Sequence, residues 1–322
     1  MFAYLVRRAL QIIPTLFVIS VVIYALLALK PGDPIDELRR GNPGFTAADY
    51  DRLIKLYGLD KPWYVRYWYW VGRAAQGDFG PSRRFGMPAA QYVFQYRLPN
   101  TLLLSGLSLL IAFVIAVPTG MLSALRQHSL FDYGVTFVNF IGVSIPIFWF
   151  GIMLMYIFSV QLRLLPAGSL QTPGIEGLWP IIVDRARHLI LPVAALSSLQ
   201  MASWTRFMRS SMLEIINLDY IRTARAKGLP ERLVTVRHTM RNAILPIITL
   251  VALAIPTVMS GAVLTETVFN WPGMGRAIFD AIVVNDFNVA MVSLMFISLL
   301  VLLFNLLADI IYVIVDPRIR YD

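Results

Sequence analysis

The sequence contains no cysteine, and only 15% of its 322 residues are charged. Without cysteine the chain can form no disulfide and offers no thiolate to a metal ion or a redox reaction. Its three histidines, His128, His188 and His238, lie far apart, so we expect no metal site. Soluble domains carry roughly 25% charged residues. The shortage of charge therefore argues against a water-soluble protein of this length.

Catalytic motifs are also missing. The chain has no glycine-rich loop ending in Gly-Lys-Ser or Gly-Lys-Thr, no His-Glu-x-x-His and no Gly-x-Ser-x-Gly. We therefore expect no enzymatic activity and no cofactor on this chain, which weighs against a membrane-embedded enzyme. If ATP drives the protein, ATP and Mg²⁺ must be bound by partner subunits.

Hydrophobic residues, in contrast, make up 57% of the chain. A helix needs about 20 apolar residues to cross the hydrocarbon core of a bilayer. The sequence predicts an all-α integral membrane protein with six transmembrane helices, at residues 9–29, 101–125, 134–162, 189–205, 243–265 and 288–315. The first run is longer than the apolar part of a signal peptide and has no clear cleavage site after it, so we interpret it as an uncleaved span.

The net charge of +9 is spread between the apolar runs and not gathered in one polar domain, which disfavours nucleic acid as a partner. Lys and Arg are retained on the cytoplasmic side of membrane proteins. With both termini cytoplasmic, the short segments on that side hold thirteen Lys and Arg residues, against four in the short loops on the other side. We therefore predict a multi-pass protein with both termini inside.

The long segment between the first two spans is predicted to lie outside and to contain two amphipathic helices. Thr46 and Asp49 are spaced as in a capping box, and Asp60 and Pro62 form a second start signal. An aromatic face follows, made of Trp63, Tyr64, Tyr67, Trp68 and Val71. This face fits anchoring at the lipid headgroups or packing on the spans, and it also fits a docking surface for an external partner.

The fourth span is the shortest and most polar of the six. It carries Ser197, Gln200 and Ser203. Polar side chains are costly in lipid unless they face protein or water. Hydrogen bonding between helices and a water-lined path both explain them.

The internal loop at about 206–242 is strongly basic. In it, Asp219 is placed to cap a short helix over residues 220–227, and Gly228 and Pro230 are placed to stop it. A solvated basic loop near anionic lipid explains the charge. It does not explain a short helix with a glycine stop, which fits insertion into a groove of a partner.

The residues of this loop resemble a known family, the dipeptide, oligopeptide and nickel branch of ABC importer permeases. The similarity lies in Tyr-Ile-Arg-Thr-Ala-Arg-Ala-Lys-Gly at 220–228, followed by Arg-Asn-Ala-Ile-Leu-Pro at 241–246. The general permease pattern begins Glu-Ala-Ala and has a shorter gap to Leu-Pro. Here Arg222 and Thr223 replace its first two residues, while Ala224 and Gly228 keep it.

Further motifs in the same order extend the resemblance over essentially the whole chain. They are Pro-Gly-Asp-Pro at 31–34, Tyr-Gly-Leu-Asp at 57–60, Gly-Asp-Phe-Gly at 77–80, Leu-Pro-Asn-Thr at 98–101, the segment 266–275 and Asp-Pro-Arg at 316–318. The resemblance implies the type I ABC importer permease fold. Residues 1–100 would hold the first span and a helical external insertion, and residues 101–322 a five-helix core with the cytoplasmic coupling loop.

The resemblance also implies partners: a second homologous permease subunit, two ATPase subunits, an external substrate-binding protein and the lipid bilayer of a bacterial or archaeal cytoplasmic (inner) membrane. In that setting Tyr220, Arg222, Thr223, Ala224, Arg225, Lys227 and Gly228 are expected to couple to the ATPase. Glu266, Phe269 and Trp271, with Ser197, Gln200 and Ser203, are expected to form the path or an external gate. A purely structural turn at 266–275 is the alternative.

The expected cargo is a di- or oligopeptide, with nickel or an oligosaccharide as alternatives within the same architecture. A different class of protein, an ion-coupled secondary transporter, would be expected to carry intramembrane acids or inverted repeats. Neither is evident in the sequence.

Overall fold

A computed structural model describes residues 2–30, 35, 44–56 and 58–315 of the chain. The motif at 31–34, Tyr57 and the motif at 316–318 lie outside the described residues. Within the described residues the chain is helical, and its β-type pairing is limited to one isolated bridge between Pro81 and Pro88.

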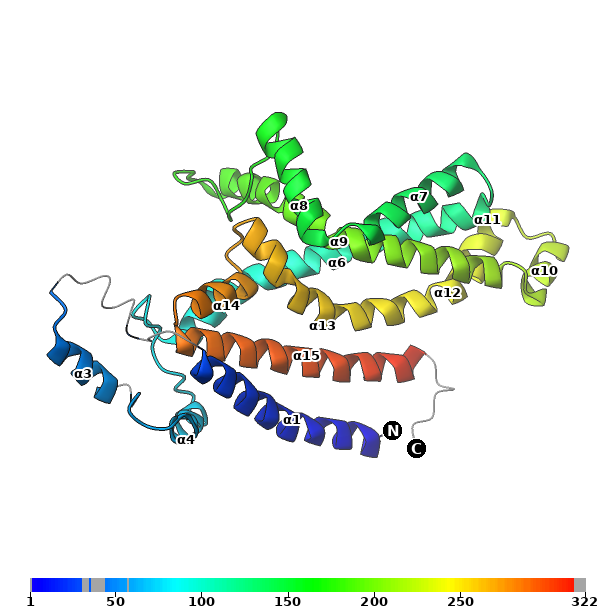
Figure 1. Cartoon of the computed structure of the whole chain (residues 1–322). Helices are drawn as coiled ribbons and strands as arrows, with labels where there is room; N and C mark the ends of the chain where they lie inside the picture. The colour runs from blue at the N-terminus through cyan, green and yellow to red at the C-terminus, as the bar shows by residue number, and fades with distance from the viewer. Residues whose placement is uncertain (1, 31–34, 36–43, 57, 316–322) are drawn as a thin grey trace.

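Three long helices form the centre of the molecule: α6 (Leu98–Leu125), α9 (Leu178–Ile215) and α13 (Leu245–Val268) (Figure 1). One face of α6 carries small residues four apart, and these are all buried: Ala112, Ala116, Gly120 and Ala124. A Cβ at Gly120 would lie 2.6 Å from the carbonyl oxygen of Thr205 on α9. The small residues therefore allow the two backbones to approach closely, as is common between membrane helices.

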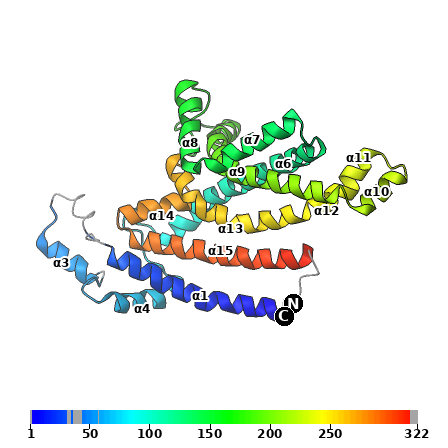
Figure 2. The same ribbon diagram turned by 45° about the vertical axis from the view of Figure 1, so that its right-hand side comes forward.

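Two further helices, α1 (Phe2–Leu29) and α15 (Phe287–Val315), pack side by side along one edge of this centre. Arg8 Nε and Asp309 Oδ2 join them by an ion pair of 3.3 Å. In Figures 1 and 2 the first residues of α1 and the last turns of α15 lie at the same end of the molecule as α10 (Asp219–Ala226). The short helix α14 (Met274–Val283) lies toward the opposite end.

By length and composition, three helices of the described chain can cross a membrane: Val6–Leu29, Ala89–Leu125 and Phe287–Ile310. Two bent pairs raise the number to five if each pair is one span: Leu130–Ser144 with Ile147–Gln161, and Glu231–Ala243 with Leu245–Pro256. The fourth predicted span, 189–205, lies inside α9. That helix is not among the candidates, in keeping with the polar residues that the sequence places there.

The prediction of one continuous span at 134–162 is wrong. Helix α7 (Leu130–Ser144) and helix α8 (Ile147–Met155), which runs on into a π-helical turn, meet at an angle of 106°. The break falls at Pro146, which has no N–H and pushes the residue before it out of the helical region. Ile145 accordingly has φ −94° and ψ 129°.

The two amphipathic helices expected between the first two spans are present, as α3 (Ala47–Leu56) and α4 (Trp63–Ala74). The capping box is confirmed: Asp49 N donates to Thr46 Oγ1 at 3.2 Å, and Thr46 N donates to Asp49 Oδ2 at 3.0 Å. The aromatic face of α4 divides in two. Trp63, Tyr67 and Val71 pack toward α1 and α15, whereas Tyr64 and Trp68 remain more than half exposed.

Candidate functional site

Helix α10 is the short helix predicted in the basic loop. It ends in a Schellman motif: Gly228 N donates to Arg225 O at 2.9 Å, and Leu229 N donates to Ala224 O at 3.4 Å. Gly228 has φ +76°, a value that L residues with a side chain rarely adopt. The predicted glycine stop is therefore confirmed.

The predicted cap is wrong. Asp219 is the first residue of α10, and the N-cap is Leu218, with no side-chain cap hydrogen bond. The Asp219 carboxylate instead pairs with Arg222 at 3.6 Å, and both side chains are largely exposed. Exposed pairs of this kind add little to stability.

The inner side of α10 is held against the chain. Ile221 and Ala224 are buried and pack with Val234 of the following π-helical segment (Val234–Thr239). The phenol oxygen of Tyr220 accepts a 2.8 Å hydrogen bond from Asn242 Nδ2. These contacts fix α10 at the end of the molecule opposite α14, where it projects beyond the long helices (Figures 1 and 2).

A two-pronged ion pair closes the loop after α10. Arg225 donates from Nε at 3.2 Å and from Nη2 at 2.7 Å to the carboxylate of Glu231. Those hydrogen bonds raise the pKa of the Arg225 guanidinium above its usual range. The pair therefore links the end of α10 to the segment that begins at Glu231.

The outer side of α10 is open and basic. Exposed residues from the predicted coupling set are Tyr220, Arg222, Thr223, Arg225, Lys227 and Gly228. Ala224 is only 6% exposed and faces the chain itself. Ala224 is therefore unavailable to a partner in this conformation, and the exposed Ala226 is the small residue left on the outer surface.

At the opposite end, Glu266 is fully buried at the last turn of α13. Its carboxylate accepts from Thr101 Oγ1 at 2.6 Å and from Arg276 N at 2.9 Å. The same Thr101 oxygen accepts from Met274 N at 2.7 Å. A Cβ at Gly273 would collide with this carboxylate, so the glycine is required by close approach. Glu266 thus joins α6, α13 and α14.

Arg276 contacts Glu266 through its backbone, and its side chain pairs with a different carboxylate. The backbone N–H of Arg276 binds Glu266, while its guanidinium lies 3.5 Å from Asp280 one turn further along α14. The aromatic residues of this segment are closely packed. Trp271 is fully buried, and its Nε1 donates to Asn100 O at 3.0 Å.

Phe269 is 1% exposed and packs on Leu191 and Ala195 of α9. Its carbonyl oxygen accepts from Ser169 N at 2.9 Å, and a Cβ at Gly168 would collide with it. In this conformation a packed turn closes one end of the molecule, and it is formed by Glu266, Phe269 and Trp271. The gate role stays a prediction, and the alternative of a structural turn gains support from their burial.

The polar residues predicted for the path in α9 are separated. Ser197 is buried, and its hydroxyl donates to Ala194 O of its own helix at 3.2 Å. Gln200 and Ser203 are partly exposed. Of the three path residues predicted in α9, Gln200 and Ser203 therefore remain accessible from outside the chain.

Sequence reasoning missed one buried ion pair. Asp132, 2% exposed on α7, accepts from Arg209 Nε at 2.6 Å and from Nη2 at 2.7 Å on α9. Ser123 of α6 also donates to it. The spacing of Ser129 and Asp132 signals a helix start, and Ser129 Oγ does accept from Asp132 N. No sequence pattern reveals the partner 77 residues away.

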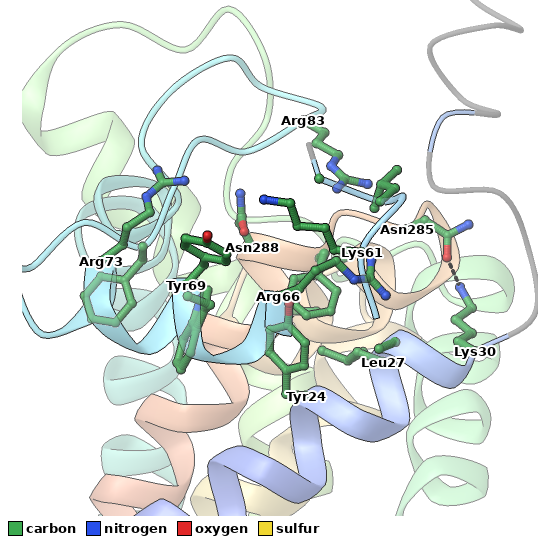
Figure 3. A pocket seen from close by; sticks show the side chains of 18 of the residues that line it. Tyr24, Leu27, Lys30, Lys61, Arg66, Tyr69, Arg73, Arg83, Asn285 and Asn288 are labelled. Atoms are coloured by element: carbon green, nitrogen blue, oxygen red, sulfur yellow. Dashed lines mark hydrogen bonds between the residues drawn. The ribbon is translucent and has the colours of Figure 1, made fainter. Parts of the chain in front are cut away.

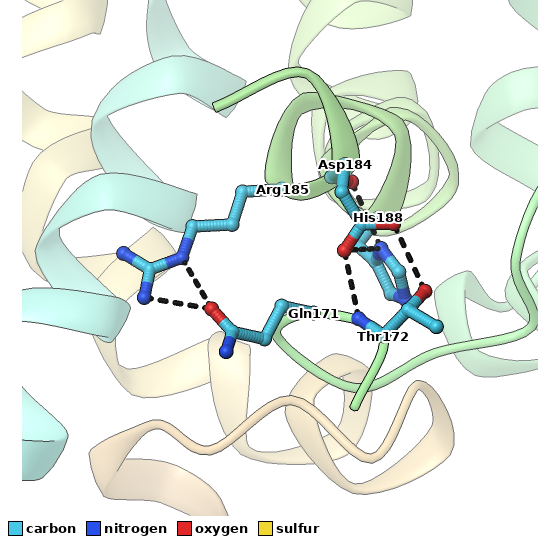
Figure 4. Close-up of polar contacts among 5 residues, drawn as sticks. All are labelled: Gln171, Thr172, Asp184, Arg185 and His188. Atoms are coloured by element: carbon cyan, nitrogen blue, oxygen red, sulfur yellow. Dashed lines mark hydrogen bonds and ion pairs between the residues drawn. The ribbon is translucent and has the colours of Figure 1, made fainter. Parts of the chain in front are cut away.

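The loop before α9 is fastened by a second polar cluster (Figure 4). Thr172 donates to Asp184 from its backbone N at 2.7 Å and from Oγ1 at 2.9 Å. The backbone hydrogen bond is the main reason that the pKa of Asp184 lies below its usual range. Arg185 donates from Nε and Nη2 to Gln171 Oε1, and these contacts hold the loop along the start of α9.

Among the residues that the structure describes, no three His, Asp or Glu side chains gather as metal ligands would. The arrangement is suited to transmitting movement. It has an exposed basic helix at one end, a closed turn at the other, and long helices that connect them.

Comparison with known proteins gives the class. Residues 116–321 match the family of binding-protein-dependent transport system inner membrane components, and residues 1–102 match the N-terminal region of such components. The chain belongs to this family, and it is a multi-pass membrane protein with the type I ABC importer permease fold.

Its relatives match it along its full length. It is 45% identical to the oligopeptide transport system permease protein AppB of Bacillus subtilis, over all of both chains. It is 34% identical to the dipeptide transport system permease protein DppB of Escherichia coli K12, over 100% of this chain and 99% of that one.

A solved structure of the inward-facing MetNI methionine ABC transporter shares the fold. Its TM-score is 0.52 at 18% identity, and the match covers 67% of this chain and 93% of the other. This likeness supports the fold alone.

Proposed function

We propose that this chain is one of two permease subunits of an ATP-driven importer for di- or oligopeptides. A second homologous permease completes the path, two ATPase subunits bind at the α10 end, and an external binding protein delivers cargo at the α14 end. ATP and Mg²⁺ are bound by the ATPase subunits. Both chain termini then face the cytoplasm.

The observation that carries the proposal is α10 itself. An eight-residue helix with a buried inner side, an anchored exit turn and an exposed basic outer side has the form of a coupling helix that rests on a partner. The movement that ATP hydrolysis drives in the ATPase subunits must reach the permease through a rigid contact. A flexible loop would absorb that movement instead of transmitting it.

The peptide cargo rests on the relatives, which include oligopeptide, dipeptide and di/tripeptide permeases. Nickel or an oligosaccharide remains the alternative within the same architecture. An ion-coupled secondary transporter would need no α10 partner, so association with ATPases distinguishes the two classes.

The test is reconstitution. The chain is co-expressed with a second permease, ATPase subunits and a binding protein of the same transport family, and the complex is placed in liposomes. We expect uptake of a labelled peptide that needs ATP and the binding protein. Uptake driven by an ion gradient without ATPases would overturn the class, and uptake of nickel in place of peptide would overturn the cargo.

A Lys227→Glu variant tests the contact at α10. Lys227 is exposed and has no role in the inner packing. We expect the variant to enter the membrane normally and to lose ATPase subunits on purification. Arg126→Glu, an exposed charge reversal at the same end outside α10, is the matched control and should retain them.

A further inference from the structure

A pocket of about 770 Å³ lies at the end of the molecule away from α10, among α1, α3, α4 and the junction of α14 with α15 (Figure 3). Its charge is strongly one-sided. Asp78 is the carboxylate in its described lining, against six basic side chains: Lys30, Lys55, Lys61, Arg66, Arg73 and Arg83. A pocket with this lining favours an anionic ligand.

The one carboxylate is already engaged. Arg73 donates to Asp78 Oδ2 from Nε at 2.9 Å and from Nη2 at 2.8 Å. Lys30, by contrast, is bound by neutral oxygens, the amide of Asn285 at 2.7 Å and the carbonyl of Ile282. Lys61 lies 4.7 Å from the centre of the Tyr69 ring. These contacts position Lys30 and Lys61 without neutralising their charge.

On α4, Arg66 Nε and Trp70 Nε1 in the pocket lining are buried and have no hydrogen-bond partner in the described structure. Both belong to α4, and a spacing of four residues places them on the same side of that helix. Buried N–H groups nearly always have a partner, so these two are donors that a ligand in the pocket can use. In Figure 3 the side chains of Lys61, Arg66 and Arg83 lie around the same space.

The surroundings indicate where the anion comes from. On α1, Val22 and Leu26 are exposed by 50% and 66%, and they precede the pocket residue Lys30 at spacings of four on the same face of the helix. The pocket lining itself contains Tyr69 and Trp70. Trp and Tyr gather where headgroups meet hydrocarbon. The pocket therefore adjoins a surface suited to acyl chains.

We propose that this pocket binds the phosphate of an anionic lipid headgroup, with Arg66 and Trp70 as donors and Lys30 and Lys61 as neighbouring charges. The acyl chains lie along the exposed apolar side of α1. Charge-assisted hydrogen bonds from a guanidinium match phosphate well. The bound lipid would hold α4 against α1 and so fix the insertion to the bundle. The proposal is independent of the cargo and of the ATPase contact.

The experiment uses the full chain in nanodiscs of phosphatidylcholine with a small fraction of phosphatidylglycerol, and native mass spectrometry counts retained lipid. We expect phosphatidylglycerol to be retained selectively. Arg66→Gln should weaken retention about tenfold or more, as expected for the loss of charge-assisted hydrogen bonds. Arg52→Gln, which removes an equal charge from α3 outside the pocket, is the matched control and should leave retention unchanged.

Lys61→Gln provides a second variant at an exposed position in case Arg66→Gln fails to fold. Equal retention by the wild type and both pocket variants would overturn the proposal. Selective retention that Arg52→Gln weakens as much as Arg66→Gln would also overturn it, because the effect would then be general charge. Binding of glycerol 3-phosphate as strongly as the intact lipid would assign the site to a soluble phosphate and overturn the lipid.

Discussion

At the scale of single residues, glycines and polar groups act through close approach and backbone geometry. Gly228 has φ +76°, yet a Cβ there would meet no atom of the chain within 4 Å. Gly273 is the opposite case, because its lack of a Cβ makes room for the Glu266 carboxylate. The first glycine is needed for its conformation, the second for space.

Gly228 therefore permits a test that separates strain from contact. Gly228→Asn should be tolerated, since Asn enters the left-handed region readily, whereas Gly228→Ala should cost about 1 kcal/mol in the stability of the turn. Gly228→Trp should insert in the membrane but lose ATPase subunits or hydrolyse ATP without transport. A Gly228→Trp complex that assembles and transports at the wild-type rate would remove α10 from the coupling mechanism.

Thr101 offers a second test, at the buried carboxylate. Thr101→Val keeps the shape but removes a donor to Glu266 and an acceptor for Met274 N. Leaving such groups unsatisfied costs about 1–3 kcal/mol each. We expect a clear fall in the unfolding temperature in detergent. Thr15→Val, which loses an exposed bond within α1, should change it little, and an equal effect of both would contradict the role of Thr101.

At the scale of elements, a buried polar contact joins two of the helices. Asp132 and Arg209 connect α7 to α9, and their side chains are 3% and 27% exposed. Removing one partner of a buried pair is far more costly than replacing both. The polar contacts thus define which helix faces meet, while apolar packing supplies most of the stability.

Arg209→Met should destabilise the chain by about 3–5 kcal/mol, because it leaves the Asp132 carboxylate buried without its cation. The double variant with Asp132→Leu should recover a large part of that loss. Unfolding of both variants in detergent, monitored by tryptophan fluorescence, provides the comparison. A double variant less stable than Arg209→Met would contradict the assignment of the cost to an uncompensated charge.

The loop before α9 gives a prediction of pH dependence. Hydrogen bonds from Thr172 lower the pKa of Asp184 below its ordinary value of 3.8. A lowered pKa means that this contact is fully present above 3.8 and is lost only as the pH falls through the lowered value. Hydrogen exchange should show the Thr172 amide protected equally at pH 7 and pH 5. Asp184→Ala should remove that protection at both, and a wild-type amide already unprotected at pH 5 would contradict the contact.

At the scale of the whole molecule, the two ends differ in build. One end holds the projecting basic α10 with the start of α1, and α14, α3 and α4 lie toward the other end (Figure 1). Phe269 and Trp271 are buried so deeply that replacing either by Ala should cost about 3–5 kcal/mol in stability. Loss of transport in such variants would therefore not establish a gate.

Topology can be tested directly because the chain has no cysteine. Single cysteines at the exposed Lys227 and Trp68 are probed in intact cells with a reagent that cannot cross the cytoplasmic membrane. We expect labelling at 68 and none at 227 until the membrane is opened. Labelling at 227 in intact cells would reverse the proposed orientation.

The sequence by itself determined the class of structure. Long apolar runs can be satisfied only in lipid, the helix signals at Thr46 and Gly228 act through neighbours in the chain, and the ordered motifs indicated the family. These features are local, so the order of residues is enough to define them. The same is true of the amphipathic pattern of α3 and α4.

Only the tertiary structure decided what depends on partners distant in the chain. It turned Ala224 inward, broke the run at 134–162 by 106° at Pro146, buried Phe269 and Trp271, and paired Asp132 with Arg209. It also assembled a basic pocket from segments more than 200 residues apart. The physical reason is that burial and pairing are properties of the space between elements, and that space is defined only when the helices pack.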